Sequence, residues 1–487
     1  MSSTPRWEAV IGLEVHAQLL TSSKMFCSCP AQYLGKPPNS NTCPVCLGLP
    51  GTLPVMNREA VRLTLLTALA LNCEIPEFTR FDRKNYFYPD LPKGYQISQY
   101  DLPLSVRGWL EFETKEGGHR AGVTRVHLEE DTGTLHHSGE IQSSPFSLVD
   151  LNRAGVPLME IVGEPDLRTS SEARAYLTTL RQTLVYIGVN DGNMEEGSLR
   201  CDANISLRPK GEEALGVKVE IKNMNSFRSL QRALDFESHR QRDLLESGGR
   251  VVQETRGWSE LEQRTVSQRS KEEAQEYRYF PEPDLPPLVI SRTEVEEVRQ
   301  ALPELPRARR ERFITQYRLA PEPARLLTER RAEADYFEAL VAAGAEAGLA
   351  AKWQLGELQG LCNAASLTVE RCPVSASDLA ALLKELAGEA LTAKVAKEAL
   401  AQAFASGRPP LELLQGEDHR QVDDQAELER WIAEAIAEQS KAAADFRAGN
   451  ERALDRLKGT VMGKSRGRAN PRLVDRLLRE RLAESPG

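Results

Sequence analysis

The stretch Val10-Ile-Gly-Leu-Glu-Val-His-Ala-Gln-Leu19 decides the fold of the first half of the chain, because polar and apolar residues alternate along it. Successive side chains of a strand point to opposite faces, so Glu14, His16 and Gln18 share one face of the predicted strand. The pattern returns in two later segments, residues 200–207 and 217–222. Three such segments predict an antiparallel sheet with one apolar face. The opposite, polar face either meets water or carries a site.

Two acidic residues fit a solvated face poorly. Glu160 lies in the apolar run Val156-Pro-Leu-Met-Glu-Ile-Val162, and Glu130 shares its alternation face with Val126 and Leu128. A carboxylate in such surroundings is costly unless it is protonated, paired or bound to a cation. Together with Glu14 and His16, the two acids predict an oxygen-rich Mg²⁺ site with one imidazole. Ordinary salt bridges would explain them equally well.

Four of the eight cysteines form a cluster in the sequence. Cys27-Ser-Cys29 and Cys43-Pro-Val-Cys46 are separated by thirteen residues, a spacing that can place four thiolates around one Zn²⁺. We therefore expect structural zinc, with free thiols as the alternative. A site with four protein ligands is closed, so it would stabilise a fold and take no part in chemistry. The scattered cysteines are expected to be small core residues: Cys73, Cys201, Cys362 and Cys372.

The chain divides by composition. At 487 residues it is longer than one core usually organises. Residues 1 to about 290 read as α+β, with helices predicted over 59–71 and 170–187, whereas later residues show Ala, Leu, Glu and Arg at helical spacing, as in 332–347 and 377–404. Proline-rich breaks lie at 281–287 and 407–410. With no apolar run of about eighteen residues and no secretory signal pattern, we expect a soluble, cytoplasmic protein without membrane contact.

Charge is distributed unevenly near the C-terminus. The net charge is −9, which argues against a chain coated with phosphate-binding residues. Residues 450–487, however, hold ten Lys or Arg against five Asp or Glu, and residues 411–449 hold four against ten. The basic end is a candidate nucleic-acid surface, and a pair of solvated helices is the plainer interpretation.

No standard phosphate loop is present. Gly459-Thr-Val-Met-Gly463-Lys464-Ser465 has one residue too few between its glycines and no preceding strand, so we reject it as an ATP site. A Gly-x-Gly-x-x-Gly after a strand is also absent from the sequence.

Several long strings resemble one family, the B subunits of tRNA-dependent amidotransferases, often called GatB. The matching strings run in the same order over nearly the whole chain: 11–16, Phe81-Asp-Arg-Lys-Asn-Tyr-Phe-Tyr-Pro-Asp90, 95–99, 147–153, Met194-Glu-Glu-Gly-Ser-Leu-Arg-Cys-Asp-Ala-Asn-Ile-Ser206, Tyr277-Arg-Tyr-Phe-Pro-Glu-Pro-Asp284 and 464–471. The resemblance implies a cradle-like catalytic domain over 1–291, a helical domain over 292–408 and a basic tail domain for tRNA binding over 409–487. The expected fold class is thus α+β, with an antiparallel sheet followed by helices.

The resemblance also implies a reaction. Such subunits transfer the γ-phosphoryl group of ATP to the side-chain carboxylate of Glu or Asp esterified to tRNA(Gln) or tRNA(Asn), and ammonia then displaces phosphate to leave the amide. Carried over residue by residue, the catalytic site falls on Glu14, His16, Glu130, Glu160, Asp202 and Glu220. Mg²⁺ would be bound by His16, Glu130 and Glu160, although the resemblance does not choose among Glu129, Glu130 and Asp131.

Further roles follow from the same resemblance. Substrate or ammonia routes would be lined by Lys84, Tyr86 and Lys93, and the zinc ligands would be Cys27, Cys29, Cys43 and Cys46. The tRNA-binding residues would be Lys464, Arg466, Arg468, Arg472 and Arg476.

The partners are also implied by the family. No glutaminase constellation is found in the sequence, so the resemblance implies a glutaminase A subunit and a small C subunit, with the cognate aminoacyl-tRNA synthetase as a candidate further partner. At 487 residues there is no room for the inserted domain of the related subunit restricted to Glu-tRNA. A zinc-stabilised tRNA-binding scaffold without catalysis is the competing interpretation.

Overall fold

The computed structural model describes residues 7–137, 146–270, 276–414, 425–465 and 469–483. The chain forms two compact units, residues 1–305 and 306–487, each described here by itself. Among the described residues, no helix is both long and apolar enough to cross a membrane.

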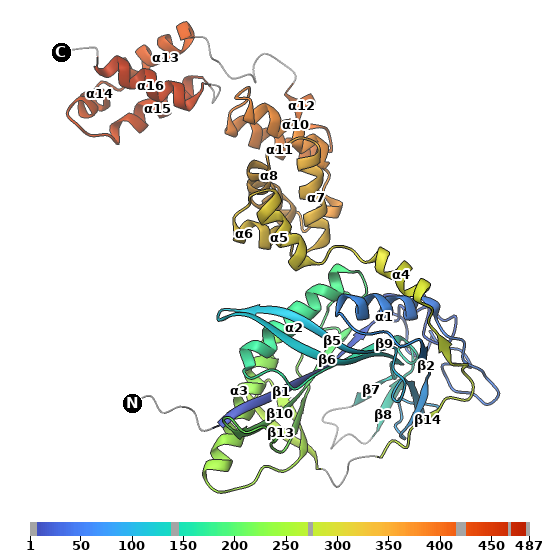
Figure 1. Cartoon of the computed structure of the whole chain (residues 1–487). Helices are drawn as coiled ribbons and strands as arrows, with labels where there is room; N and C mark the ends of the chain where they lie inside the picture. Colours follow the sequence, from blue (N-terminus) through green and yellow to red (C-terminus); the bar gives the residue numbers. More distant parts are fainter. Residues whose placement is uncertain (1–6, 138–145, 271–275, 415–424, 466–468, 484–487) are drawn as a thin grey trace. The chain divides into compact units, whose positions relative to one another are not determined.

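The first unit is built on an eleven-stranded sheet, which confirms the predicted antiparallel core (Figure 1). Its strands are β1 (Trp7–Gln18), β3 (Asp82–Asn85), β4 (Tyr95–Ser98), β5 (Ser105–Thr114), β6 (Gly117–Glu130), β9 (Pro157–Gly163), β10 (Leu199–Pro209), β11 (Val219–Lys222), β12 (Glu254–Ser259), β13 (Arg264–Ser270) and β14 (Phe280–Pro281). The order is β13-β12-β11-β10-β1-β9-β6-β4-β3-β14, with β5 paired to β6. Two small sheets join β2 (Phe78–Thr79) to β15 (Leu288–Val289) and β7 (Thr134–His137) to β8 (Ser147–Asp150).

Strand alternation separates the two faces of this sheet as the sequence predicts. Ile11, Leu13 and Val15 of β1 are each 1% exposed and belong to the main core. Helices α1 (Arg58–Ala70), α2 (Ser170–Tyr186) and α3 (Phe227–Glu246) lie on that side and complete the core (Figure 1). The opposite face, called the polar face below, carries the charged residues of β1, β6, β9, β10 and β11.

Register fixes which residues meet on the polar face. β1 lies between β10 and β9, and His16 is opposite Arg200 on one side and Glu160 on the other. On the next strand along, His127 is opposite Glu160. A β-bulge between Val123 and Arg125 precedes this regular pairing of β6 with β9. Beyond the bulge, Arg125, His127 and Glu129 therefore share the polar face.

The first compact unit extends past the predicted boundary at residue 291. Helix α4 (Arg292–Ala301) follows the Pro-rich segment, and its Val298 is buried in the main core against α1. The unit therefore ends at Leu305, because the first helix after the composition shift packs onto the sheet domain.

The second unit is helical, as predicted. Its elements are α5 (Pro306–Gln316), α6 (Pro321–Leu327), α7 (Arg331–Ala342), α8 (Ala347–Trp353), the π-helix η2 (Gln354–Leu358), α9 (Gln359–Ala364), the 3-10 turn η3 (Val369–Arg371), α10 (Ala376–Ala387), α11 (Ala393–Ser406), α12 (Pro410–Leu413), α13 (Gln425–Glu438), α14 (Ser440–Arg447), α15 (Ala453–Lys464) and α16 (Pro471–Ala483). Two separate hydrophobic clusters lie within it, one before and one after residues 415–424. The rejected phosphate-loop string lies in α15, in agreement with its rejection.

Candidate active site

Four side chains meet at the centre of the polar face. His16 Nε2 lies 3.5 Å from Glu160 Oε2 and 3.7 Å from Glu129 Oε1. His127 Nε2 approaches Glu160 Oε2 to 3.3 Å from the neighbouring strand. All of these residues are brought together by strand register, so their positions are set by the backbone of three adjacent strands. We call His16, Glu129 and Glu160, with His127 beside them, the carboxylate cluster.

The cluster has the composition and spacing of a divalent-cation site. One ligand atom from each of His16, Glu129 and Glu160 lies within 4.8 Å of the others. With Mg²⁺–oxygen distances near 2.1 Å, ligand atoms of one ion should be about 3–4.2 Å apart, so small rotations would allow all three to bind. Carboxylate oxygens are the preferred donors for such an ion.

Electrostatics keep the cluster charged. Burial alone would favour neutral Glu160, but the charge and hydrogen bond of His127, then those of His16, hold the pKa of Glu160 well below its ordinary value. Burial also opposes a charged His16, yet the hydrogen bond and charge of Glu160, with the charge of Glu129, raise the pKa of His16 above its ordinary value. The carboxylate is therefore ionised and ready to bind a cation.

Glu130 does not join this cluster, in contrast to the expected ligand set. It points to the other face of β6, where its Oε1 accepts hydrogen bonds from Lys93 Nζ at 2.5 Å and from the Ile97 backbone N–H at 3.0 Å. The physical reason is alternation: Glu129 and Glu130 are adjacent, so they must face opposite sides of the strand. For Glu130 the structure shows the ordinary salt bridge that the sequence analysis left open.

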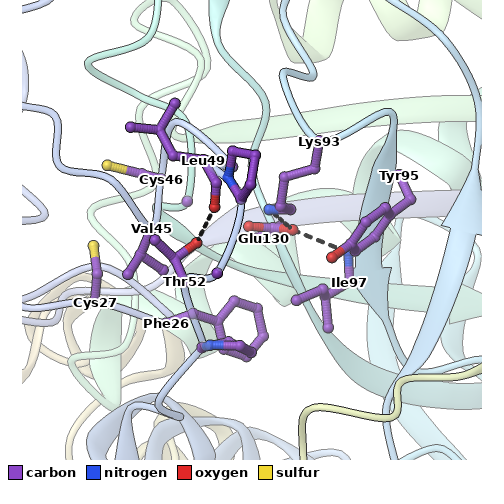
Figure 2. Close-up of a pocket in the computed structure, with 15 residues that line it drawn as sticks. Phe26, Cys27, Val45, Cys46, Leu49, Thr52, Lys93, Tyr95, Ile97 and Glu130 are labelled. Carbon is purple, nitrogen blue, oxygen red and sulfur yellow. Dashed lines mark hydrogen bonds and ion pairs between the residues drawn. The ribbon is translucent and has the colours of Figure 1, made fainter.

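Lys93 and Glu130 line a cavity of about 210 Å³ between the sheet and the cysteine loop (Figure 2). Figure 2 shows the two side chains directed toward each other, while the sulfur atoms of Cys27 and Cys46 point away from them. This Lys93–Glu130 cavity is separate from the carboxylate cluster, because β6 lies between Glu130 and Glu129.

A larger cavity, of about 460 Å³, opens beside His16 and Glu129 on the polar face. Three cations line it: Lys84, Arg200 and Lys222. Arg200 is held by buried Asp131, whose Oδ2 accepts from it at 3.0 Å and from Gln18 at 2.8 Å. Cations around a volume of this size suit an anionic ligand.

The remaining predicted acids surround this cavity or lie next to it. Asp202 lines the cavity and accepts a hydrogen bond from Lys222 at 2.7 Å. Glu220 contacts the same Lys222 at 3.1 Å and accepts from Thr255 at 2.7 Å. Glu14 accepts from Asn204 and lies two residues along β1 from His16. Lys84 and Tyr86 both line the cavity, but Lys93 belongs to the other one.

The four predicted zinc ligands come together. Their sulfur atoms all lie within 4.8 Å of one another, and two of the pairs are 3.6 and 4.0 Å apart. Sulfurs around tetrahedral zinc, at Zn–S distances of 2.3 Å, should be about 3.8 Å apart. A hydrogen bond from the Cys27 thiol lowers the pKa of Cys46 to about 4, and the Cys43 backbone N–H donates to the same sulfur at 3.0 Å. The cluster therefore fits Zn²⁺.

The predicted tRNA-binding residues of the tail are partly engaged with carboxylates. Lys464 donates to Glu434 at 3.1 Å and to Glu438 at 2.5 Å, which reduces its availability to phosphate. Arg472 and Arg476 are exposed on α16. Arg466 and Arg468 lie outside the described residues.

Sequence reasoning missed His127, Glu129 and Arg200 as members of the site. A signal was present for the first two: in Val126-His-Leu-Glu-Glu130 the polar positions opposite the Val126 and Leu128 face are His127 and Glu129. No local signal identifies Arg200 as a cavity residue, because its partner Asp131 is far away in the sequence.

Comparison with known proteins agrees with this geometry. Residues 9–296 match the GatB/GatE catalytic domain, and residues 335–482 match the GatB domain. The chain is similar to curated B subunits of aspartyl/glutamyl-tRNA(Asn/Gln) amidotransferases. It is 51% identical to that of Carboxydothermus hydrogenoformans and 52% identical to that of Thermomicrobium roseum, in each case over 98% of this chain and 99% of the relative. The protein of Moorella thermoacetica is 50% identical over 98% of this chain and its own full length. The chain therefore belongs to the GatB family, the B subunits of aspartyl/glutamyl-tRNA amidotransferases.

Proposed function

We propose that this chain carries out the ATP-dependent activation and amidation of Glu-tRNA(Gln), Asp-tRNA(Asn) or both, as the B subunit of a heterotrimer with a glutaminase A subunit and a small C subunit. In the first step a side-chain carboxylate oxygen attacks the γ-phosphorus of ATP, and the bond from that phosphorus to ADP breaks. Ammonia then attacks the acyl carbon, phosphate leaves, and loss of a proton gives the amide. The cell compartment that supplies these substrates is the cytoplasm.

The observation that carries this proposal is the carboxylate cluster beside the cation-lined cavity. Glu160 is ionised, and His16 Nε2 lies 3.5 Å from it and 3.7 Å from Glu129. We assign the proposed Mg²⁺ to His16, Glu129 and Glu160, with Glu129 in place of Glu130. When bound, the ion would neutralise phosphate charge and help to orient the phosphoryl group.

The chain's own residues would bind and orient both substrates. Arg200, Lys222 and Lys84 present positive charge along the larger cavity, where they would bind phosphate oxygens. Asp131 holds Arg200 in place, so its guanidinium is preorganised. Lys93 and Glu130 line the cavity on the other face of β6, which is our candidate for the ammonia route.

The cysteine cluster and the tail would serve structure and tRNA binding. Zn²⁺ held by Cys27, Cys29, Cys43 and Cys46 would stabilise the loop that forms one wall of the Lys93–Glu130 cavity. The basic tail would bind tRNA through shape and phosphate contacts, remote from the reacting carboxylate.

The test is amide formation by the chain coexpressed with its A and C subunits. Glu-tRNA and Asp-tRNA are supplied with ATP, Mg²⁺ and either glutamine or free ammonium, and ADP release is followed in parallel. We expect His16→Ala and Glu160→Gln to abolish ammonium-dependent amide formation and ADP release, because both remove a group from the cluster. Glutaminase activity of the complex should remain.

The matched control is Glu164→Gln, an acid that follows β9 directly and bonds to Thr124 on the surface. It should leave amide formation unchanged. If His16→Ala and Glu160→Gln remain active, the residue assignments are wrong. If the wild-type complex consumes no ATP with either tRNA, the chain is a zinc-stabilised tRNA-binding scaffold instead.

A further inference from the structure

Arg125 is a cation whose partner is missing from the described parts of the chain. It lies on the polar face of β6, two residues from His127 and four from Glu129. Its guanidinium forms no ion pair or hydrogen bond with any described residue, and its Nε is shielded from solvent without a hydrogen-bond acceptor. A buried donor on a charged group is costly when it is left unpaired. Such a group in a native fold is expected to meet an anion when the protein is at work.

Stacked tyrosines lie beside this guanidinium. The rings of Tyr100 and Tyr279 are parallel within 10° and their centroids are 4.1 Å apart, while Arg125 Cζ lies 5.7 Å from the Tyr100 centroid. Tyr277 contacts Tyr279 edge to face at 6.0 Å. None of these rings belongs to the hydrophobic cores of the described chain, and Tyr100 is 51% exposed. The rings are therefore available to a ligand and are not needed to fill a core.

The tyrosine segment is held rigidly from below. The Asn85 backbone N–H donates to the Tyr277 carbonyl at 3.0 Å, and its side-chain amide donates to the Arg278 carbonyl at 2.8 Å. Pairing of β14 with β3 continues directly from Tyr279. A ring platform fixed in this way loses little entropy when a flat ligand stacks on it.

The platform lies at the edge of the carboxylate cluster. Burial and then the negative charges of Glu129 and Glu160 raise the pKa of Tyr279, so both carboxylates are near its hydroxyl. A ligand on Tyr100 and Tyr279 would thus have one end within reach of the reacting centre and its phosphate near Arg125.

The geometry points to Arg125, Tyr100 and Tyr279 as a subsite for an adenosine phosphate unit, with the base on the tyrosine rings and a phosphate oxygen on the guanidinium. Aromatic stacking and an arginine fork are the two contacts by which proteins hold nucleotides without reading a sequence. The identity of the base rests on the proposed function, since ATP and the 3′ end of tRNA both carry adenosine beside a phosphate. Either substrate can supply the unit.

The experiment uses the assembled complex and two readouts. The first is the dissociation constant of AMP, measured by titration calorimetry without any reaction. The second is the KM for ATP and, separately, for aminoacyl-tRNA in the ammonium-dependent assay. The variants are Arg125→Ala, Tyr100→Leu and Tyr100→Phe. The control is Arg120→Ala, which removes another cation on β6 that lies 3.7 Å above an aromatic ring, Trp109, but is exposed on the β5–β6 hairpin.

We expect Tyr100→Leu to weaken AMP binding about fivefold or more, the range found when a base loses its aromatic partner. Arg125→Ala should weaken it about tenfold or more, because a charge-assisted hydrogen bond is lost. Tyr100→Phe should recover most of the loss seen with leucine, and Arg120→Ala should match the wild type. A rise in KM confined to ATP identifies ATP as the source of the unit, and a rise confined to aminoacyl-tRNA identifies the tRNA end.

The subsite is overturned if Arg125→Ala and Tyr100→Leu leave AMP affinity and both KM values within twofold of the wild type. It is also overturned if Arg120→Ala weakens AMP binding as much as Arg125→Ala does. If the wild-type complex forms no amide while AMP binding still depends on Arg125 and Tyr100, the proposed function fails and the subsite stands.

Discussion

The two sides of strand β6 differ in how completely their polar groups are satisfied. On the side of Glu130, the carboxylate meets both Lys93 and a backbone N–H. On the side of Glu129, buried atoms of several residues lack hydrogen-bond partners: Arg125 Nε, His127 Nδ1, Arg200 Nε and Asn204 Oδ1. A satisfied buried group stabilises the fold, whereas an unsatisfied one is tolerated where a ligand is to bind. The comparison teaches that one strand separates a structural face from a binding face.

The largest expected effect falls on the structural side, at the cysteine cluster. Cys46→Ala should lower the zinc content from one ion per chain to a small fraction and destabilise the first unit strongly. Zinc binding contributes about 10–16 kcal/mol of folding free energy in zinc-finger peptides, and a three-cysteine site keeps only part of it. Zinc content by mass spectrometry and the thermal midpoint of unfolding measure the change. Cys73→Ala, a buried cysteine outside the cluster, should keep its zinc.

The next effect is the loss of the Lys93–Glu130 pair. Glu130→Ala leaves the Lys93 ammonium largely buried without its carboxylate, and breaking such a pair costs about 3–5 kcal/mol. Urea unfolding followed by tryptophan fluorescence measures this cost. Glu59→Ala removes an exposed pair with Arg62 and should cost at most about 1 kcal/mol. Equal costs for the two variants would mean that the Glu130 side is not the structural face.

The binding face should respond in activity and not in stability. Glu129→Gln should reduce ammonium-dependent amide formation about 10²–10³-fold, the loss seen when one group that stabilises transition-state charge is removed. The urea midpoint should stay near the wild-type value. Mn²⁺ binding, followed by paramagnetic resonance, should weaken in Glu129→Gln and persist in Glu130→Gln. If Glu130→Gln loses Mn²⁺ instead, the originally predicted ligand set is restored.

The smallest effect lies outside both faces, in the basic tail. Reversing the charges of Arg466 and Arg468 to Glu should weaken tRNA binding several-fold, and each lost phosphate contact should reduce the salt slope of binding by about 0.7–0.9. Filter binding at several salt concentrations measures both quantities. Arg299→Glu on α4 is the control for charge alone. Undiminished binding would remove the tail from the mechanism.

Local sequence patterns were sufficient for the sheet and for part of the site. Alternation in residues 10–19 predicts β1 and both of its faces, and the spacing of Cys27, Cys29, Cys43 and Cys46 predicts one cluster. Both inferences depend on neighbours in sequence, where periodicity and spacing are informative.

Contacts between distant segments could not be predicted in the same way. Glu130 is identified as half of a salt bridge only when β4 brings Lys93 to it, and Tyr100 meets Tyr279 only through the pairing of β3 with β4 and β14. The boundary near residue 291 likewise depends on α4 packing against α1. These pairings follow from the closure of the sheet and not from any periodicity.

The bulge between Val123 and Arg125 limits how this family can vary in length. An extra residue in the turn between β5 and β6, at 115–116, lies in solvent and leaves every later residue on its own side. The same insertion after the bulge would exchange the sides, sending His127 and Glu129 into the apolar core and Leu128 onto the catalytic surface. Deletions and insertions acceptable to natural selection should therefore accumulate before residue 123 and be excluded from 125–130.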